Sequence, residues 1–119
     1  MKVAIVGTRT FNDYRLLKKF VLQCVPLNQI EYVVTGDAKG ADTLAYVFAK
    51  GNNIPYDRLE AEWTKHGKAA GPIRNQQVVD RADCVIAFWD GKSPGTRSTI
   101  QMAKRAGKKY WICNIGEKE

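Results

Sequence analysis

The chain has 119 residues, of which 45% are hydrophobic and 26% are charged, and its net charge is +7 at neutral pH. This length and balance are typical of one soluble globular domain with a single core. No apolar run approaches the roughly 20 residues that span a bilayer, which excludes a membrane-spanning helix. The excess of Lys and Arg favours anionic partners, a class that includes nucleotides and nucleic acids. Because these cations are spread along the chain, charge alone does not choose between the two.

The N-terminus leads directly into an apolar run and lacks the pattern of a signal peptide. Cys24, Cys84 and Cys113 are widely spaced and form no C-x-x-C pair, which is typical of small core residues in a reducing compartment. One histidine, His66, offers little to a histidine-based metal site or triad, and we expect neither a metal nor a cofactor. A cytoplasmic protein is the simplest interpretation.

Five apolar runs have the length and composition of β-strands. The third has a proline near its start and charges inside it, which favours an edge position in a sheet. The runs cover residues 2–6, 31–35, 54–59, 83–89 and 108–115.

Segments with helical spacing lie between these runs. The N-cap of the first is Asn12 or Asp13, and Gly51 ends the second. Residues 60–71 show no clean periodicity, and a loop of this length favours a functional role. The four helices are expected over residues 14–23, from 41 to 51, from about 72 to 82 and from about 95 to 107.

Strands and helices alternate along the chain, which predicts an α/β fold with a parallel sheet covered by helices on both faces. The expected architecture is a single Rossmann-like three-layer sandwich over residues 1–119, with strand order 3-2-1-4-5. The carboxyl ends of all five strands then share one edge, where ligands of open parallel sheets bind. Three turns meet there, at residues 7–10, 36–42 and 89–96.

The turn after the second strand is the most informative one. The stretch from Val33 to Asp42 predicts a buried strand, a turn bracketed by Gly36 and Gly40, and the first turn of a helix. The first helical N–H groups have no intrahelical partner and attract anions, and glycines let a phosphate approach the backbone. The alternative is an ordinary turn in which Gly36 supplies a positive φ. The convergence of three such turns favours ligand contact.

Four segments occur in a recognisable order: VGTRTF at residues 6–11, TGDAKGAD at 35–42, GKAAGPIRN at 67–75 and AFWDGKSPGT at 87–96. Together they resemble the small YspA-like branch of the SLOG superfamily, a group of Rossmann-like domains related to Smf/DprA and LOG proteins. The resemblance covers nearly the whole chain, from Lys2 to about Cys113. It is more specific for the fold than for an activity, because a fold does not fix a function.

The resemblance implies that a nucleotide or a nucleotide-derived small molecule binds at the shared strand edge. LOG-type enzymes release a base from a nucleoside monophosphate, and they carry the pattern P-G-G-x-G-T-x-x-E and an arginine on the preceding helix. Arg74 matches that arginine, and Gly95 and Thr96 match the G-T pair. Thr99 stands where the pattern has its glutamate, and the Pro-Gly-Gly opening is absent.

Glycosidic hydrolysis needs a carboxylate to activate water and to stabilise the developing positive charge. With no glutamate at the motif position, Asp37, Asp42 or Asp90 would have to supply it. Asp42 has two other interpretations, a bond to a ribose hydroxyl or a favourable charge in the first turn of a helix. Trp63 is a candidate platform for a base, and Trp89 either stacks a base or caps the core.

Backbone N–H groups of the glycine turns are the expected phosphate contacts, and the arginines are expected to add charge-assisted bonds. If the protein is an enzyme, Arg74 and Asp42 are the candidates for its catalytic residues. No cluster has metal-ligand spacing. The expected ligand-binding residues are Gly7, Thr8, Arg9, Gly36, Asp37, Lys39, Gly40, Asp42, Trp63, Lys68, Arg74, Asn75, Trp89, Gly95 and Thr96.

Three functions fit these features. The first, which we favour, is a module that senses, sequesters or processes a nucleotide-derived small molecule. The second is a nucleotide N-glycosidic hydrolase of the LOG type. The third is DprA-like binding of single-stranded nucleic acid, which the positive charge permits but which normally uses several exposed aromatic residues. The resemblance leaves a homodimer open, and no membrane partner is expected.

Overall fold

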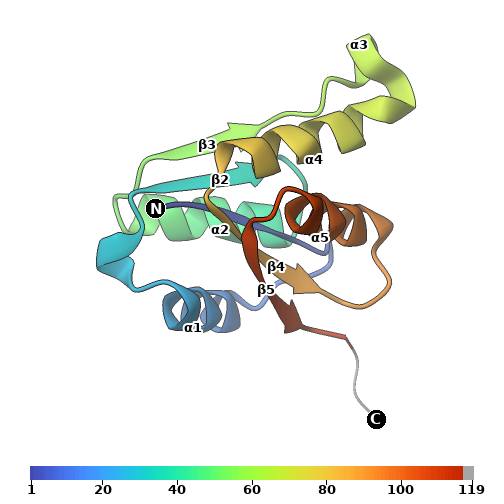
Figure 1. Ribbon diagram of the computed structural model, residues 1–119. Coiled ribbons are helices and arrows are strands. Elements are labelled where there is room, and N and C mark those ends of the chain that lie inside the picture. The colour runs from blue at the N-terminus through green and yellow to red at the C-terminus, as the bar shows by residue number, and fades with distance from the viewer. Residues whose placement is uncertain (117–119) are drawn as a thin grey trace.

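The computed structural model describes residues 1–116, whose centre is a sheet of five parallel strands (Figure 1). The strand order is β3-β2-β1-β4-β5, which confirms the predicted topology. β3 lies at the edge of the sheet, as the proline and the charges of this segment predicted. The strands are β1 (Lys2–Gly7), β2 (Tyr32–Gly36), β3 (Tyr56–Leu59), β4 (Cys84–Trp89) and β5 (Lys109–Asn114). The direction of the winding reverses between β1 and β4, so the carboxyl ends of these two strands flank the expected site.

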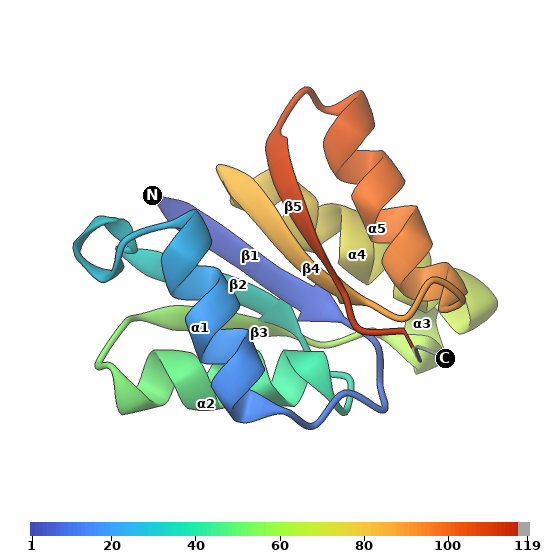
Figure 2. The ribbon, with the colours of Figure 1, turned by 90° about the horizontal axis from the view of Figure 1, so that it is seen from below.

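Helices cover both faces of the sheet, as Figure 2 shows. Side chains alternate between the faces along each strand. In β1, Val3 and Ile5 pack under α1 and α2, whereas Ala4 and Val6 pack under α4 and α5. The sheet is therefore buried on both sides, which explains its nearly continuous apolar strands. The helices are α1 (Tyr14–Cys24), α2 (Ala41–Gly51), α4 (Ala70–Arg81) and α5 (Pro94–Arg105).

The loop after β1 is anchored by aromatic packing and a helix cap. The ring of Phe11 stacks on Phe88 of β4, with centroids 5.1 Å apart, and Phe20 meets Phe88 edge-on at 5.6 Å. Asp13 is the N-cap of α1, where its carboxylate accepts from the N–H of Leu16 at 3.0 Å. These contacts fix the path of the chain next to the carboxyl edge of the sheet.

The segment before α4 is more ordered than its sequence indicates. Residues 60–71 were expected to be irregular, but they contain the short helix α3 (Trp63–His66), the 3-10 turn η2 (Gly67–Ala69) and the start of α4 at Ala70. Pro72 is therefore the third residue of α4 rather than the first, a position where its missing N–H costs nothing. Figure 1 shows α3 projecting at the outer end of α4.

Gly51 ends α2 as expected, but the positive φ of this turn, 56°, falls on Asn53. Asparagine tolerates this conformation better than most residues. Cys84 and Cys113 are buried on the α1 and α2 face of the sheet, as the sequence predicts for core residues. Within residues 1–116, no helix has both the length and the apolarity that a membrane crossing requires.

Candidate functional site

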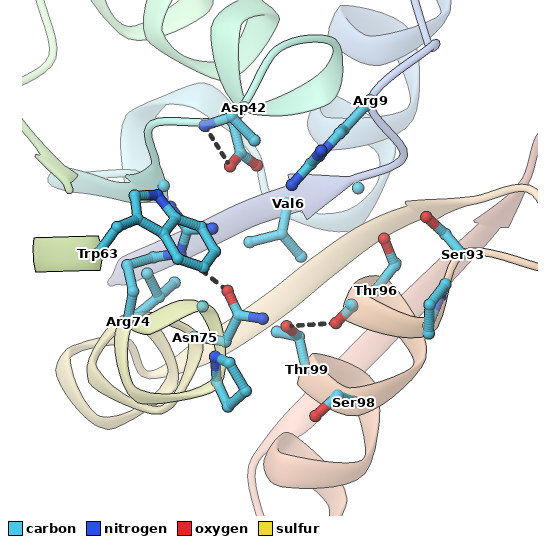
Figure 3. A pocket seen from close by; sticks show the side chains of 18 residues that line it. Val6, Arg9, Asp42, Trp63, Arg74, Asn75, Ser93, Thr96, Ser98 and Thr99 are labelled. Atoms are coloured by element: carbon cyan, nitrogen blue, oxygen red, sulfur yellow. Dashed lines mark hydrogen bonds between the residues drawn. The ribbon is translucent and has the colours of Figure 1, made fainter. Parts of the chain in front are cut away.

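A cavity of about 550 Å³ opens at the edge of the sheet where the strands end. The turns after β1 and β2, α3, the first part of α4 and the start of α5 form its walls, as Figure 3 shows. Its volume is in the range of small-molecule sites. The lining residues are Val6, Gly7, Arg9, Gly36, Ala38, Asp42, Trp63, Gly71, Pro72, Arg74, Asn75, Val78, Ser93, Pro94, Gly95, Thr96, Ser98 and Thr99.

Most of the predicted ligand-binding residues line this cavity. They come from five separate segments of the chain, which the parallel topology brings to one edge. The predicted residues in the lining are Gly7, Arg9, Gly36, Asp42, Trp63, Arg74, Asn75, Gly95 and Thr96.

Thr8 and Gly40 lie outside the lining and join two turns to each other. The Thr8 hydroxyl accepts from the N–H of Asp90 at 3.2 Å, and the Thr8 carbonyl accepts from the N–H of Ala41 at 3.2 Å. Gly40 has a φ of 76°, and a Cβ there would collide with the backbone oxygens of Thr8 and Arg9. These contacts hold the loop after β1 against the start of α2.

The other predicted residues outside the lining have different surroundings. Trp89 donates from Nε1 to the carbonyl of Ser93 at 3.1 Å, which fixes the turn that leads into α5. Trp89 thus has a structural partner in the turn before α5. Three further predicted residues, Asp37, Lys39 and Lys68, are exposed.

Gly36 lies between two buried charged groups. A Cβ on Gly36 would be 2.6 Å from Oδ2 of Asp42 and 2.8 Å from Nη1 of Arg74. Because the φ of Gly36 lies outside the left-handed region, the position requires glycine for space and not for backbone conformation. Asp42 is 5% exposed and Arg74 is 8% exposed, so the cavity wall contains a carboxylate and a guanidinium that are both inside the protein.

Protein groups already hold the guanidinium of Arg74. Its Nη1 forms an ion pair with Asp37 and also lies 3.4 Å from the carbonyl of Leu59, and its Nε donates to Oδ1 of Asn75 at 2.9 Å. Burial of a charge is costly unless it is paired in this way. Arg74 therefore positions the turn after β2 and the start of α4 as well as facing the cavity.

Arg58 also stabilises the turn after β2, a role that the sequence analysis did not predict. Its Nε donates to the carbonyl of Gly36 at 3.2 Å, and its Nη2 donates to the carbonyl of Ala38 at 3.3 Å and to the hydroxyl of Thr43 at 2.9 Å. A charged residue in a weak edge strand is typical of a solvent-facing position, so the sequence contains no signal for this role.

Asp42 is the acidic residue of the cavity lining. Its Oδ2 accepts from the N–H of Ala38 at 3.3 Å. Burial raises its pKa from 3.8 to about 6, and the charges of Arg74 and Arg58 and the Ala38 N–H oppose this shift only in part. The group is consequently ionised at neutral pH and takes up a proton in mildly acidic solution.

The start of α5 presents free hydrogen-bond donors to the cavity. Ser93, its N-cap, makes no side-chain capping bond, and within residues 1–116 the N–H groups of Gly95 and Thr96 have no acceptor. Both residues line the cavity, and nothing lies within 4 Å of the Cβ position of Gly95. Uncapped N–H groups and the helix dipole favour an anion here.

The turn before α5 is held rigid by Asp90. Its Oδ1 accepts from the N–H of Lys92 at 2.9 Å and from the N–H of Ser93 at 2.8 Å. These bonds to the carboxylate lower the pKa of Asp90. Its charge is thus used to shape the turn.

Arg9 and Trp63 contribute exposed side chains to the lining. Among the residues that the structure describes, the Arg9 guanidinium has no hydrogen bond or ion pair, and Figure 3 shows it reaching toward Val6. Trp63 is 54% exposed, and its ring lies 3.5 Å from the Cβ position of Gly71 at the start of α4. A cation and an aromatic surface are therefore available to a ligand.

Replacing Gly36 with alanine is expected to damage the site more than the fold. The new methyl group must displace the ends of the Asp42 and Arg74 side chains, which costs about 1–3 kcal/mol of stability by overpacking. Thermal unfolding checks this cost, and calorimetric titration with any ligand found for the cavity checks the site. An unchanged affinity would show that the placement of these two side chains does not matter to the ligand.

Comparison with known proteins identifies the family of this chain. Residues 1–66, which run from β1 to the end of α3, match the model of the YAcAr family, described as "YspA, cpYpsA-related SLOG family". The chain is also similar to the Gene 61 protein of Mycobacterium phage D29, with 34% identity over 126 aligned positions that cover 98% of each sequence. The match confirms the resemblance read from the motifs, and the chain belongs to the YspA, cpYpsA-related SLOG family.

Proposed function

We propose that this protein binds a nucleotide or a nucleotide-derived small molecule in the cavity at the carboxyl edge of the sheet. The observation that carries the proposal is that one cavity contains several unpaired hydrogen-bond donors that suit an anion. The N–H groups of Gly95 and Thr96 have no acceptor within residues 1–116, and the guanidinium of Arg9 has no partner there. Together they offer a phosphate a helix N-terminus and a charged side chain.

The opposite part of the cavity suits a base. Trp63 offers an exposed aromatic surface, and the apolar side chains of Pro72 and Val78 extend the lining. Stacking on an aromatic side chain typically contributes about 1–3 kcal/mol per base. In the view of Figure 3, Trp63 lies on one side of the cavity, with Ser93 and Thr96 on the other. A molecule with a phosphate at one end and a base at the other matches this arrangement.

The start of α2 is the weaker phosphate site. Its first N–H, that of Ala41, donates to the Thr8 carbonyl at 3.2 Å, and the carboxylate of Asp42 already lies in its first turn. A second anion there would face that carboxylate. The phosphate is therefore assigned to α5 and not to the glycine turn that dominates the sequence.

The cavity lacks the glutamate that LOG-type hydrolases carry at this position of their motif. Thr99 lines the cavity at the position of the motif glutamate, and its hydroxyl donates to the carbonyl of Gly95 at 3.1 Å. Asp42 is the acidic side chain among the lining residues, so any turnover would depend on it. Release of free base is measured in the same samples as binding.

The test compares two arginines that differ in position. Thermal unfolding is followed with AMP, ADP, ATP, NAD, ADP-ribose and cyclic nucleotides, where a ligand at a hundred times its Kd stabilises the fold by about 2.7 kcal/mol. Arg9→Ala is expected to raise the Kd of the ligand about 10-fold or more, because a charge-assisted bond contributes about 1.5–3 kcal/mol. Its own folding stability should be nearly unchanged, since the side chain has no partner within the described residues.

Arg15→Ala is the matched control, because it removes the same charge from an exposed position on α1, outside the lining. It should bind as the unaltered chain does. The absence of any shift across the panel, together with salt-sensitive binding to single-stranded oligonucleotides, would replace the proposal with nucleic-acid binding.

A further inference from the structure

We propose that the site selects ribonucleotides over deoxyribonucleotides, and that the buried carboxylate of Asp42 makes the selection by accepting hydrogen bonds from the ribose hydroxyls. This inference rests on the proposed function and specifies its ligand. It concerns the middle of the cavity, between the phosphate donors of α5 and the aromatic surface of Trp63.

Asp42 has capacity for further hydrogen bonds. It is 5% exposed and lines the cavity, yet it forms no salt bridge within residues 1–116. The N–H of Ala38 occupies one side of Oδ2 at 3.3 Å. The hydroxyl of Thr35 is near, but its single proton goes to the carbonyl of Ile5 at 2.6 Å. A carboxylate has about four lone-pair sites, so it can accept further donors from a ligand.

The charged groups around Asp42 show which kind of donor fits. Arg74 faces it from α4 but is paired with Asp37, and Arg58 faces it from β3 but donates to backbone carbonyls and to Thr43. Arg9 lines the same cavity from the loop after β1. A cationic ligand group at Asp42 would face the positive charge of these guanidinium groups, and an anionic one would face the carboxylate. A neutral donor, such as a hydroxyl, meets neither penalty.

The position of Asp42 matches the middle of a nucleotide. In the view of Figure 3, Trp63 lies on one side of Asp42 and Thr96 lies on the other. A base on Trp63 and a phosphate on α5 leave the sugar between them, and a ribose offers two adjacent hydroxyl donors. Carboxylates perform the same recognition of ribose in dinucleotide-binding folds.

The experiment measures the Kd of four matched pairs of nucleoside 5′-monophosphates by calorimetry at pH 7.5. Each pair, such as AMP and 2′-deoxy-AMP, differs only at the sugar, so the result does not require the preferred base to be known. Each pair that binds should show a ribonucleotide preference of about 10-fold or more, because a hydrogen bond to a charged group contributes that much. Asp42→Asn should reduce the preference to a few-fold, mainly by weakening the ribonucleotide.

Asp80→Asn is the control, because it removes an exposed carboxylate of α4 that lies outside the cavity lining. It should keep the full preference. Equal Kd values within the pairs of the unaltered chain would overturn this inference and leave the proposed function standing. Binding of neither member of any pair, in a chain shown to be folded, would overturn this inference, and the absence of a thermal shift with every nucleotide of the panel above would overturn the proposed function as well.

Discussion

Replacing Gly40 with alanine should destabilise the protein by about 3 kcal/mol or more, which corresponds to a fall in Tm of about 10 °C or more. Two costs add at this position. Gly40 has a φ of 76°, which L-residues adopt with strain, and the new Cβ would collide with the backbone oxygens of Thr8 and Arg9. Backbone atoms cannot rotate away as a side chain can, so the loop after β1 must separate from α2.

Gly51→Ala is the control for this measurement, because it changes the glycine at the opposite end of α2. Gly51 has a helical conformation, and nothing lies within 4 Å of its Cβ position. Alanine should therefore stabilise the protein by about 0.5–1 kcal/mol. Urea unfolding of both variants tests the pair of expectations. A Gly40 variant as stable as the unaltered chain would mean that the contact between the two turns does not form.

Asp42→Asn should make the protein more stable at pH 7.5 and have little effect at pH 4. The pKa of Asp42 is raised from 3.8 to about 6, so between these values the folded chain keeps a proton that the unfolded chain releases. Stability therefore falls as the pH rises through this window, and above it the ionised carboxylate costs the folded state about 2–3 kcal/mol. Asparagine has no such charge and retains an acceptor for the Ala38 N–H.

Urea unfolding at several pH values between 4 and 7.5 measures this difference. The gain in stability from Asp42→Asn should grow with pH, mostly between pH 4 and 6, whereas Asp80→Asn should show no comparable growth because Asp80 is exposed. A gain that is constant across the range would show that Asp42 titrates normally.

A buried carboxylate that lowers stability at neutral pH is typical of a functional position. Asp42 combines this cost with a place in the cavity wall, next to a glycine that leaves room for it. Hydrogen bonds from the proposed ribose hydroxyls would offset part of this cost, and the proposed ligand would then gain affinity from the same group that weakens the empty fold.

The fold could be predicted because its signals are local and repeated. Apolar runs at residues 2–6 and 83–89 and helical spacing at 14–23 each predict an element, and their alternation leaves few possible topologies. The prediction of an irregular loop at residues 60–71 was wrong, because a four-residue helix and a 3-10 turn are too short to produce a periodic pattern. Contacts of Trp63 with the start of α4 order it instead.

By itself, the sequence determined the strand order, the edge at which the cavity opens and half of the residues that line it, because parallel topology sends all the strand ends to one edge. Only the tertiary structure showed which of the charged side chains near the cavity are paired within the protein and which are free to contact a ligand. Arg74 is paired with Asp37, Arg58 is bound to carbonyls, and Arg9 has no partner within residues 1–116. Partners such as these are distant in the chain, and only packing shows which charges are paired and which donors stay free.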